Sequence, residues 1–476
     1  MKYLFLLASS LFMLTTHAQT YLIHANLVDP VSQKTLADQT IVYKGDTILQ
    51  VGPSSGIKPT KGATVIDASG KWVMPGMVDA HVHFFQTGGI FTRPDAIDLR
   101  QQQPYDKEIE WYKTHMEDQL RRYLSCGITT VIDDGATLAL LQQRDTFASK
   151  NYAPRILMAG PLISTAYNPK PFDVVPDPDK PFYSVTTPED AVKMTQKEYP
   201  YHPDFIKIWN IILDPNKQAG AEKYLSLVKA TIEEAHAHHY KVAVHATERI
   251  TAQLAVEAGA DFLVHEVEDE VVDDAFIKLL KGHGVVLCPT LVVVDGYFST
   301  FGQHYVPTPE DIAIGDPVQL ASLQLLSTLP DTMLAKRYLL LTKLRAKKNV
   351  TEDSIRKVNL KKMMDAGVII ATGTDAGNPG TLHASSFFKE IRAMQQAGLS
   401  NWQIITASTL NGAKALGRDS EFGSIQKGRA ADLLILNANP VADLGNLEKL
   451  ESIIHRGVRL YPEKIKPSAP LGAPKQ

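Results

Sequence analysis

The sequence has few cysteines, no excess of charge of one sign and no glycine-rich phosphate loop. Only Cys126 and Cys288 are present, both in apolar runs, which predicts buried free thiols and excludes a zinc-ribbon pattern. The formal net charge is −3 over 476 residues, with both signs interspersed, so nothing indicates a nucleic-acid partner. The missing phosphate loop disfavours the alternative of a doubly wound nucleotide-binding sheet.

The N-terminal 18 residues have the pattern of a secretory signal peptide. Lys2 precedes an apolar run that ends at Leu14, and the small residue Ala18 stands before Gln19. This run is too short to span a bilayer comfortably, and no later segment has the required apolar length. We therefore expect cleavage after Ala18, a periplasmic or secreted mature protein, and no membrane contact after cleavage.

The rest of the chain divides according to its pattern of apolar residues. Residues 19–74 and 419–465 show short strands and turns, whereas 75–418 alternates apolar strands with amphipathic helices. The strand candidates of the middle segment are 77–82, 129–133, 155–159, 205–209, 241–245, 262–265, 285–289 and 368–372. They predict an α/β protein with a (β/α)8 TIM barrel, and the two end segments predict one small composite β-sandwich domain. The Pro- and Ala-rich end, 466–476, predicts a flexible tail.

Two histidines stand near the end of the first candidate barrel strand. Residues i and i+2 of a strand project from the same face, so His81 and His83 point in one direction. Two imidazoles on one face can bind one divalent metal ion. Taken alone, the spacing also fits a packed or surface pair of histidines.

Four further polar side chains lie near the C-terminal ends of later strand candidates. Lys207 lies in the fourth, His245 and His265 end the fifth and sixth, and Asp375 follows the eighth. In a TIM barrel these strand ends meet at one mouth, where reactive groups are placed. Taken individually, each residue has another explanation. The histidines could be packed in the interior, the lysine could be a snorkelling surface residue, and the aspartate could be a helix N-cap. Together with the first pair, they are better explained by one metal-binding site.

Several motifs extend this pattern over nearly the whole mature chain. They are PGMVDAHVH at 75–83, GITTV at 127–131, HA at 245–246 with AGAD at 258–261, PTL at 289–291, GTDAG at 373–377 and GSIQKGRAADL at 423–433. With these motifs the chain resembles the metal-dependent amidohydrolase superfamily. Within it, the sequence is most similar to the imidazolonepropionase-like and Xaa-Pro dipeptidase-like branch.

The resemblance implies a binuclear site. In binuclear members a lysine of the fourth strand is carboxylated and bridges two metal ions, and Lys207 matches that position. The implied ligands are His81, His83 and Asp375 for one ion, His245 and His265 for the other, and modified Lys207 between them. The nitrogen-rich set favours two zinc ions, although Mn, Fe or Co could substitute. Such ions would activate a water as hydroxide, and Asp375 would be the catalytic proton carrier.

One departure from the dipeptidase-like pattern concerns substrate binding. Members often carry a Gly-Gly-His turn after the third strand, whereas this chain reads ISTAYNPKP at 163–171. The missing histidine argues against a strict prolidase. Tyr167 and Asn168 in this stretch, and His383 after the eighth strand, are the candidate substrate contacts. A capping role is the alternative for His383.

The leading functional prediction is an exported metal-dependent amidohydrolase. Its partner would be a small-molecule amide, such as a dipeptide, an N-acyl amino acid or a cyclic amide. The alternatives are a mononuclear deaminase in which Lys207 is only structural, a lactonase-type hydrolase, and a non-catalytic metal-binding protein. Metal stoichiometry separates the binuclear hydrolase from the deaminase. The exact substrate is left open, because pocket residues come from loops, and so is assembly into a homo-oligomer.

Overall fold

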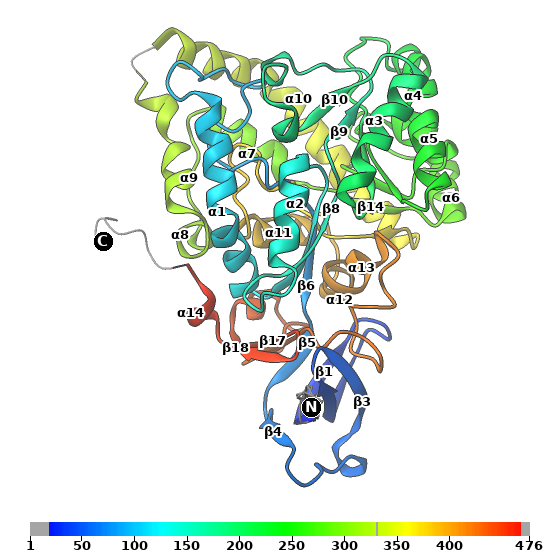
Figure 1. The fold of residues 1–476 in the computed structure, drawn as a ribbon, viewed down its shortest axis with the longest axis vertical. Coiled ribbons are helices and arrows are strands. Elements are labelled where there is room, and N and C mark those ends of the chain that lie inside the picture. Colours follow the sequence, from blue (N-terminus) through cyan, green and yellow to red (C-terminus); the bar gives the residue numbers. More distant parts are fainter. Residues whose placement is uncertain (1–18, 330–331, 468–476) are drawn as a thin grey trace, which may run out of the picture.

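The computed structural model describes residues 19–329 and 332–467. The predicted signal peptide and residues 468–476 of the predicted tail lie outside the described residues. Figure 1 shows two regions, with the strands of both chain ends gathered at one end of the molecule. At the other end, helices surround the strands of the middle segment.

The strands are short, as the turn signals predict. They are β1 (Thr20–Asp29), β2 (Lys34–Lys44), β3 (Thr47–Pro53), β4 (Thr64–Asp67), β5 (Trp72–Pro75), β6 (Met77–Val82), β7 (Ile128–Asp133), β8 (Arg155–Met158), β9 (Leu162–Ser164), β10 (Phe182–Ser184), β11 (Ile206–Trp209), β12 (Val242–His245), β13 (Phe262–Val264), β14 (Val286–Cys288), β15 (Ile369–Ile370), β16 (Leu433–Leu436), β17 (Leu450–His455) and β18 (Val458–Leu460).

The α-helices occupy the connections between the middle strands and extend to the C-terminal region. They are α1 (Tyr105–Ser125), α2 (Leu138–Phe147), α3 (Pro188–Glu198), α4 (Lys217–Ala237), α5 (Arg249–Glu257), α6 (Asp274–His283), α7 (Val292–Phe301), α8 (Pro309–Ala313), α9 (Pro317–Ser322), α10 (Thr332–Asp365), α11 (Ser386–Gln396), α12 (Asn401–Thr406), α13 (Gly412–Lys414) and α14 (Pro462–Ile465). None of them, within the part of the chain that the structure describes, is both long and apolar enough to cross a bilayer.

Strands from both ends of the chain form one sheet. Its order is β18-β17-β16-β5-β1-β2-β3, and β4 pairs with β1. The two ends meet where β16 pairs antiparallel with β5, which places Leu433 opposite Pro75. Apolar side chains of both ends, including Leu22, Ile41 and Ile435, share one buried cluster. The strands predicted at the two termini are therefore hydrogen-bonded to each other.

The middle strands form two parallel sheets whose edges approach each other. The described strands run in the orders β6-β7-β8 and β10-β9-β11-β12-β13-β14-β15. Isolated parallel bridges join Ala159 to Phe205 at one edge and Val82 to Ala376 at the other. Because all these pairings are parallel, the C-terminal ends of the strands lie on one side of the sheets. That side carries the predicted ligands.

All eight predicted middle strands are found, and each observed end lies within two residues of the predicted one. The eighth is only two residues long, because the chain then leaves the regular ladder and follows β6, where the amide of Ala80 donates to the carbonyl of Thr372 (2.9 Å). β9 and β10 were not predicted. They follow a break at Gly160-Pro161, where proline removes a ladder donor.

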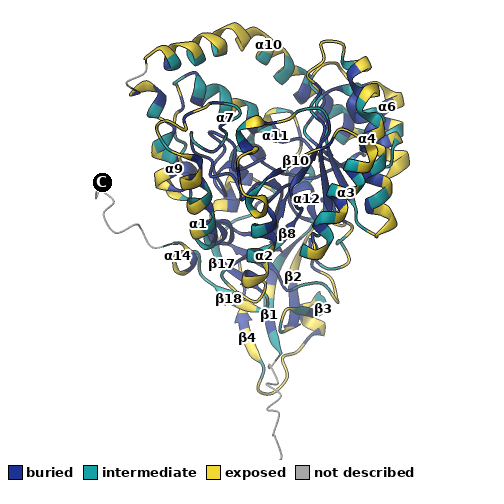
Figure 2. Ribbon diagram, turned by 45° about the horizontal axis from the view of Figure 1, so that its top comes forward, coloured by how far each residue is buried: buried dark blue, intermediate teal, exposed yellow. Residues whose placement is uncertain are grey.

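The described part of the long connection between β14 and β15 contains four α-helices, the last of which is α10. The apolar pattern of residues 334–344 predicts a helix there, but these residues are only part of this 34-residue element. Near its C-terminal end, Asn359 donates to the carbonyls of Val267 (3.0 Å) and Glu270 (2.9 Å), which anchors the helix on the loop after β13. Its N-terminal half is more exposed, and Figure 2 shows it at the helical end of the molecule.

Gly76 joins the terminal sheet to the middle segment and has no room for a side chain. Its amide donates to the carbonyl of Asp432 (2.9 Å). A Cβ atom at this position would lie 2.0 Å from Oγ1 and 2.7 Å from Cβ of the buried Thr129. The second distance shows that a rotamer change of Thr129 alone does not relieve the clash.

We expect Gly76→Ala to lower the free energy of unfolding by about 1–3 kcal/mol, because overpacking forces the backbone to shift. Urea-induced unfolding followed by circular dichroism measures this change. Gly282→Ala, at a helical position where nothing lies within 4 Å of the added Cβ, is the control and should be neutral or slightly stabilising. Equal stability of the Gly76 variant and the wild type would contradict the prediction.

Candidate metal centre

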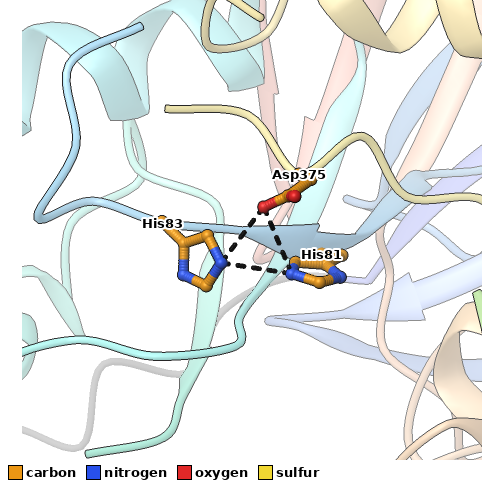
Figure 3. A group of neighbouring side chains, drawn as sticks. All are labelled: His81, His83 and Asp375. Atoms are coloured by element: carbon orange, nitrogen blue, oxygen red, sulfur yellow. Dashed lines mark hydrogen bonds and ion pairs between the residues drawn. The ribbon is translucent and has the colours of Figure 1, made fainter. Parts of the chain in front are cut away.

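Three predicted ligands converge at the end of β6 (Figure 3). The Nε2 atoms of His81 and His83 lie 3.2 Å apart, and Oδ1 of Asp375 lies 3.4 Å and 3.1 Å from them, respectively. Nδ1 of His83 is within hydrogen-bond distance of the carbonyl of Gly135 (3.1 Å), which leaves its Nε2 facing the other two residues. Two imidazole nitrogens and one carboxylate oxygen form a donor set that suits a divalent ion.

Hydrogen bonds to β6 hold Asp375 in place. The amide and hydroxyl of Thr374 donate to the buried carboxylate of Asp79 at 3.1 and 2.9 Å, and the amide of Asp375 donates to the carbonyl of His81 (2.8 Å). Asp375 has a φ of +56°, a strained conformation that surrounding contacts must maintain. The helix that follows, α11, has Ser385 at its N-cap position, so Asp375 is not an N-cap residue.

The other two histidines lie beside this group. The ring centroids of His245 and His265 are 4.2 Å apart, and those of His265 and His81 are 5.0 Å apart. Nδ1 of His265 is 2.7 Å from the hydroxyl of Thr290, and both residues have positive φ angles. Burial lowers the pKa of His81, His245 and His265 well below the usual value. The neutral imidazoles therefore keep a lone pair available for a metal ion.

Lys207 lies on β11 with its side chain almost fully buried. Its Nζ is 3.8 Å from Oδ1 of Asp134, and burial lowers the pKa of the lysine although this carboxylate opposes the change. The same burial raises the pKa of Asp134 to about 7. A neutral amine is the form that can react with carbon dioxide to give a carbamate, so the environment fits the predicted modification.

Buried polar atoms without hydrogen-bond partners surround this point. Among the described residues, Nδ1 of His81, Oδ1 of Asp375 and both carboxylate oxygens of Asp134 have none. Buried polar atoms are normally paired, and leaving them unpaired costs free energy. A bound cation would satisfy the oxygens, so the residues present fit a metal ion.

All six predicted ligand residues line one cavity of about 250 Å³. The members of this set are His81, His83, Lys207, His245, His265 and Asp375. One wall is aromatic, since Phe182 lies between Trp209 and Phe85, with ring centroids 4.6 Å and 5.9 Å away. The structure therefore brings the six residues together beside an apolar wall.

The three predicted substrate contacts do not line this cavity. Tyr167 lies behind the wall, with its ring 5.3 Å from that of Trp209, and Asn168 lines a separate surface pocket. His383 is buried, with Nδ1 3.0 Å from the hydroxyl of Tyr123 and Nε2 2.8 Å from the carbonyl of Gln86. Burial lowers the pKa of His383 to about 4. Both of its ring nitrogens are thus used within the protein.

Other residues of the site were not predicted from the sequence. Asp134 directly follows β7, and this position at a strand end was a signal that could have identified it. Arg93 comes from the loop after β6 and pairs with Asp95 through two hydrogen bonds (2.8 and 2.7 Å). Its Nη1 donates to Asn378 (2.8 Å) and to the hydroxyl of Tyr297 (3.1 Å). These loop residues carry no recognisable spacing, so only the tertiary structure locates them.

Sequence comparisons relate the chain to known amidohydrolases. The model of the amidohydrolase family matches residues 72–458. The imidazolonepropionase of Alkaliphilus metalliredigens is 25% identical over 432 residues, which cover 85% of each chain. The imidazolonepropionase of Syntrophobacter fumaroxidans is 34% identical, but the match spans only 112 residues, or 24% of that enzyme.

A solved structure and the family match agree with this relationship. A crystal structure of a Xaa-Pro dipeptidase with bound methionine is similar in fold, with a TM-score of 0.68 and 22% identity over 93% of this chain and 100% of that one. The family match confirms the predicted superfamily and the predicted class of hydrolases acting on carbon–nitrogen bonds. The chain belongs to the amidohydrolase family.

Proposed function

We propose that this protein is an exported, metal-dependent amidohydrolase that cleaves an amide C–N bond of a small molecule. The observation that carries the proposal is the convergence of four histidines, one buried lysine and one aspartate on a single cavity. The names of the relatives, imidazolonepropionase and Xaa-Pro dipeptidase, agree with a substrate containing a C–N bond. Export rests on the signal-peptide pattern alone, and N-terminal sequencing of the exported protein tests it.

The site would sit at the mouth of a closed (β/α)8 barrel. The bridges between Ala159 and Phe205 and between Val82 and Ala376 support closure, because they connect the edges of the two parallel sheets. A buried cluster that includes side chains of β6, β7, β8, β12, β13 and β14 supports it as well. The shared core of the terminal sheet supports the companion proposal that this sheet folds over itself as a β-sandwich.

The ligand groups divide into two neighbouring sets. His81, His83 and Asp375 would hold one divalent ion, and His245 and His265 a second, with carboxylated Lys207 contacting both. Zinc suits this nitrogen-rich set. When bound, two such ions would lower the pKa of a shared water and polarise the substrate carbonyl.

The protein supplies proton transfer and orientation. Asp375 would accept the proton of the attacking water and pass it to the leaving nitrogen, which is general acid–base catalysis. The hydrogen bonds from Thr374 to Asp79 hold the segment that carries Asp375 against β6. The aromatic side chains Phe182 and Trp209 exclude bulk water from one side, which strengthens electrostatic interactions within the cavity.

A mononuclear site is the second candidate, and one contact favours it. The distance of 3.8 Å between Lys207 and Asp134 also fits an unmodified lysine that balances a buried carboxylate. Lys207 would then be structural, as in the deaminase alternative.

Metal analysis separates the two candidates. We expect two zinc ions per chain by elemental analysis of the purified, zinc-replete protein. We also expect a carbamate signal in the ¹³C NMR spectrum of the intact protein supplied with ¹³C-bicarbonate, which a Lys207→Ala variant should lack. A panel of dipeptides, N-acyl amino acids, lactams and lactones then tests the reaction. One ion per chain, together with an unmodified lysine, would replace the binuclear proposal by the mononuclear one.

A further inference from the structure

A second and larger cavity adjoins the candidate metal centre beneath α10. Its volume is about 510 Å³, compared with about 250 Å³ for the cavity around the histidines. Arg93, Glu268, Val294 and Tyr297 line both cavities, so the two spaces are adjacent at these residues. We call the larger space the α10 chamber.

The α10 chamber is walled by aromatic and aliphatic side chains. Among the residues that line it are Tyr297, Phe298 and Phe301 of α7 and Tyr338 and Leu341 of α10. The ring centroids of Tyr297 and Phe301 lie 5.5 Å apart, and those of Phe301 and Tyr338 lie 5.2 Å apart. These distances are typical of packed aromatic pairs, which offer a preformed surface for another ring.

The helix above the chamber is held at both of its ends. The hydroxyl of Tyr338 donates to the carbonyl of Ala96 (2.8 Å), and Arg356 forms an ion pair with Glu268 (3.0 Å). The charged groups at the junction are therefore already paired, since Arg93 is engaged by Asp95 in the same way. The aromatic and aliphatic side chains offer apolar contact to a ligand, while Arg345, Asn349 and Glu352 line the remaining part of the chamber.

We propose that the substrate carries an apolar arm of aromatic size, which occupies the α10 chamber while the scissile amide lies among the histidines. A small lactam or a dipeptide with short side chains would fill only the smaller cavity. Pockets of several hundred Å³ lined by aromatic residues are typical of sites for larger ligands. The position of the scissile bond rests on the proposed function, whereas the binding of the arm depends only on the chamber.

The test uses two ligands that lack the scissile carbonyl, N-(4-phenylbutyl)glycine and N-methylglycine. Isothermal titration calorimetry on the purified full-length protein measures their affinities. We expect the phenylbutyl ligand to bind at least tenfold more tightly. Leu341→Trp, which fills the chamber, should remove most of this difference, and Thr342→Trp serves as a second filling variant. Leu340→Trp is the matched control, because Leu340 is 56% exposed and does not line the chamber.

Equal affinities of the two ligands for the wild type would overturn the proposal, as would an unchanged preference in both filling variants. A loss of preference in the Leu340 variant as well would assign the effect to α10 in general and also overturn it. Hydrolysis of N-acetyl-leucine and N-(4-phenylbutanoyl)-leucine by the zinc-loaded protein tests the proposed function separately. If neither amide is cleaved, the proposed function fails, while the calorimetry still decides whether the chamber binds an apolar arm.

Discussion

Lys207→Ala should reduce the affinity for the metal pair more than about 100-fold and abolish measurable hydrolysis. Loss of a residue that only orients a metal ligand through a hydrogen bond typically lowers metal affinity by about 10–100-fold. Loss of a ligand that bridges both metal ions should lower it further. The substitution also removes the ion pair of Lys207 with the fully buried Asp134, whose carboxylate oxygens have no hydrogen-bond partner among the described residues. Metal content after dialysis against a weak chelator, together with turnover, measures the effect.

Adding a short-chain carboxylic acid to the Lys207→Ala variant tests whether Lys207 supplies a carboxylate to the metal ions. Propionate should restore part of the metal content and activity of the Lys207 variant, because it can supply the missing carboxylate. Lys229→Ala removes an exposed lysine of α4 and should behave as the wild type. If the Lys207 variant retains its metal content and gains nothing from propionate, Lys207 is not a bridging ligand.

Asp375→Asn should lower kcat by about 10²–10⁴-fold, the usual contribution of a general acid–base group. KM should change little, because the proton transfer belongs to the transition state and not to substrate binding. The amide oxygen of asparagine can still face His81 and His83, so metal content should fall less than in the Lys207 variant. Steady-state kinetics and metal analysis on the same preparation separate the two effects.

The control for this prediction is Asp173→Asn, which changes an exposed aspartate outside the cavity. It should leave both constants unchanged. If the Asp375→Asn variant has a normal kcat, another group transfers the proton. The buried Asp134 would then be the next candidate. A rise in KM without a fall in kcat would instead indicate that Asp375 contributes mainly to binding.

Periodicity predicted most of the strands, because local patterning reflects burial directly. Apolar runs identified Met77–Val82 with its bounds unchanged. They identified the seven other predicted middle strands within one or two residues at each end, including the short β15. β9 and β10 escaped prediction because three-residue strands carry too little pattern to distinguish them from loops. The full length of α10 was not predicted either, because its polar C-terminal half is held by contacts with a loop that is distant in sequence.

The predicted metal ligands came together because they share one topological property. Each stands at or near the C-terminal end of a parallel strand, and parallel pairing places these ends on one side of the sheets. The predicted substrate contacts had no such constraint. His383 follows a strand too, but the hydroxyl of Tyr123 and the carbonyl of Gln86 take both of its ring nitrogens, and neither partner is near it in sequence.

The sequence by itself determined the alternation of strands and helices, the family and the set of residues able to hold metal ions. These follow from residue type and spacing, which report which side chains are buried and on which face they lie. Only the tertiary structure decided which polar atoms are left without partners, that Asp134 lies beside Lys207, and that a large aromatic chamber adjoins the histidines. Cavity shape depends on loops and helices far apart in the chain, such as α7 and α10, whose approach is set by packing and not by local pattern.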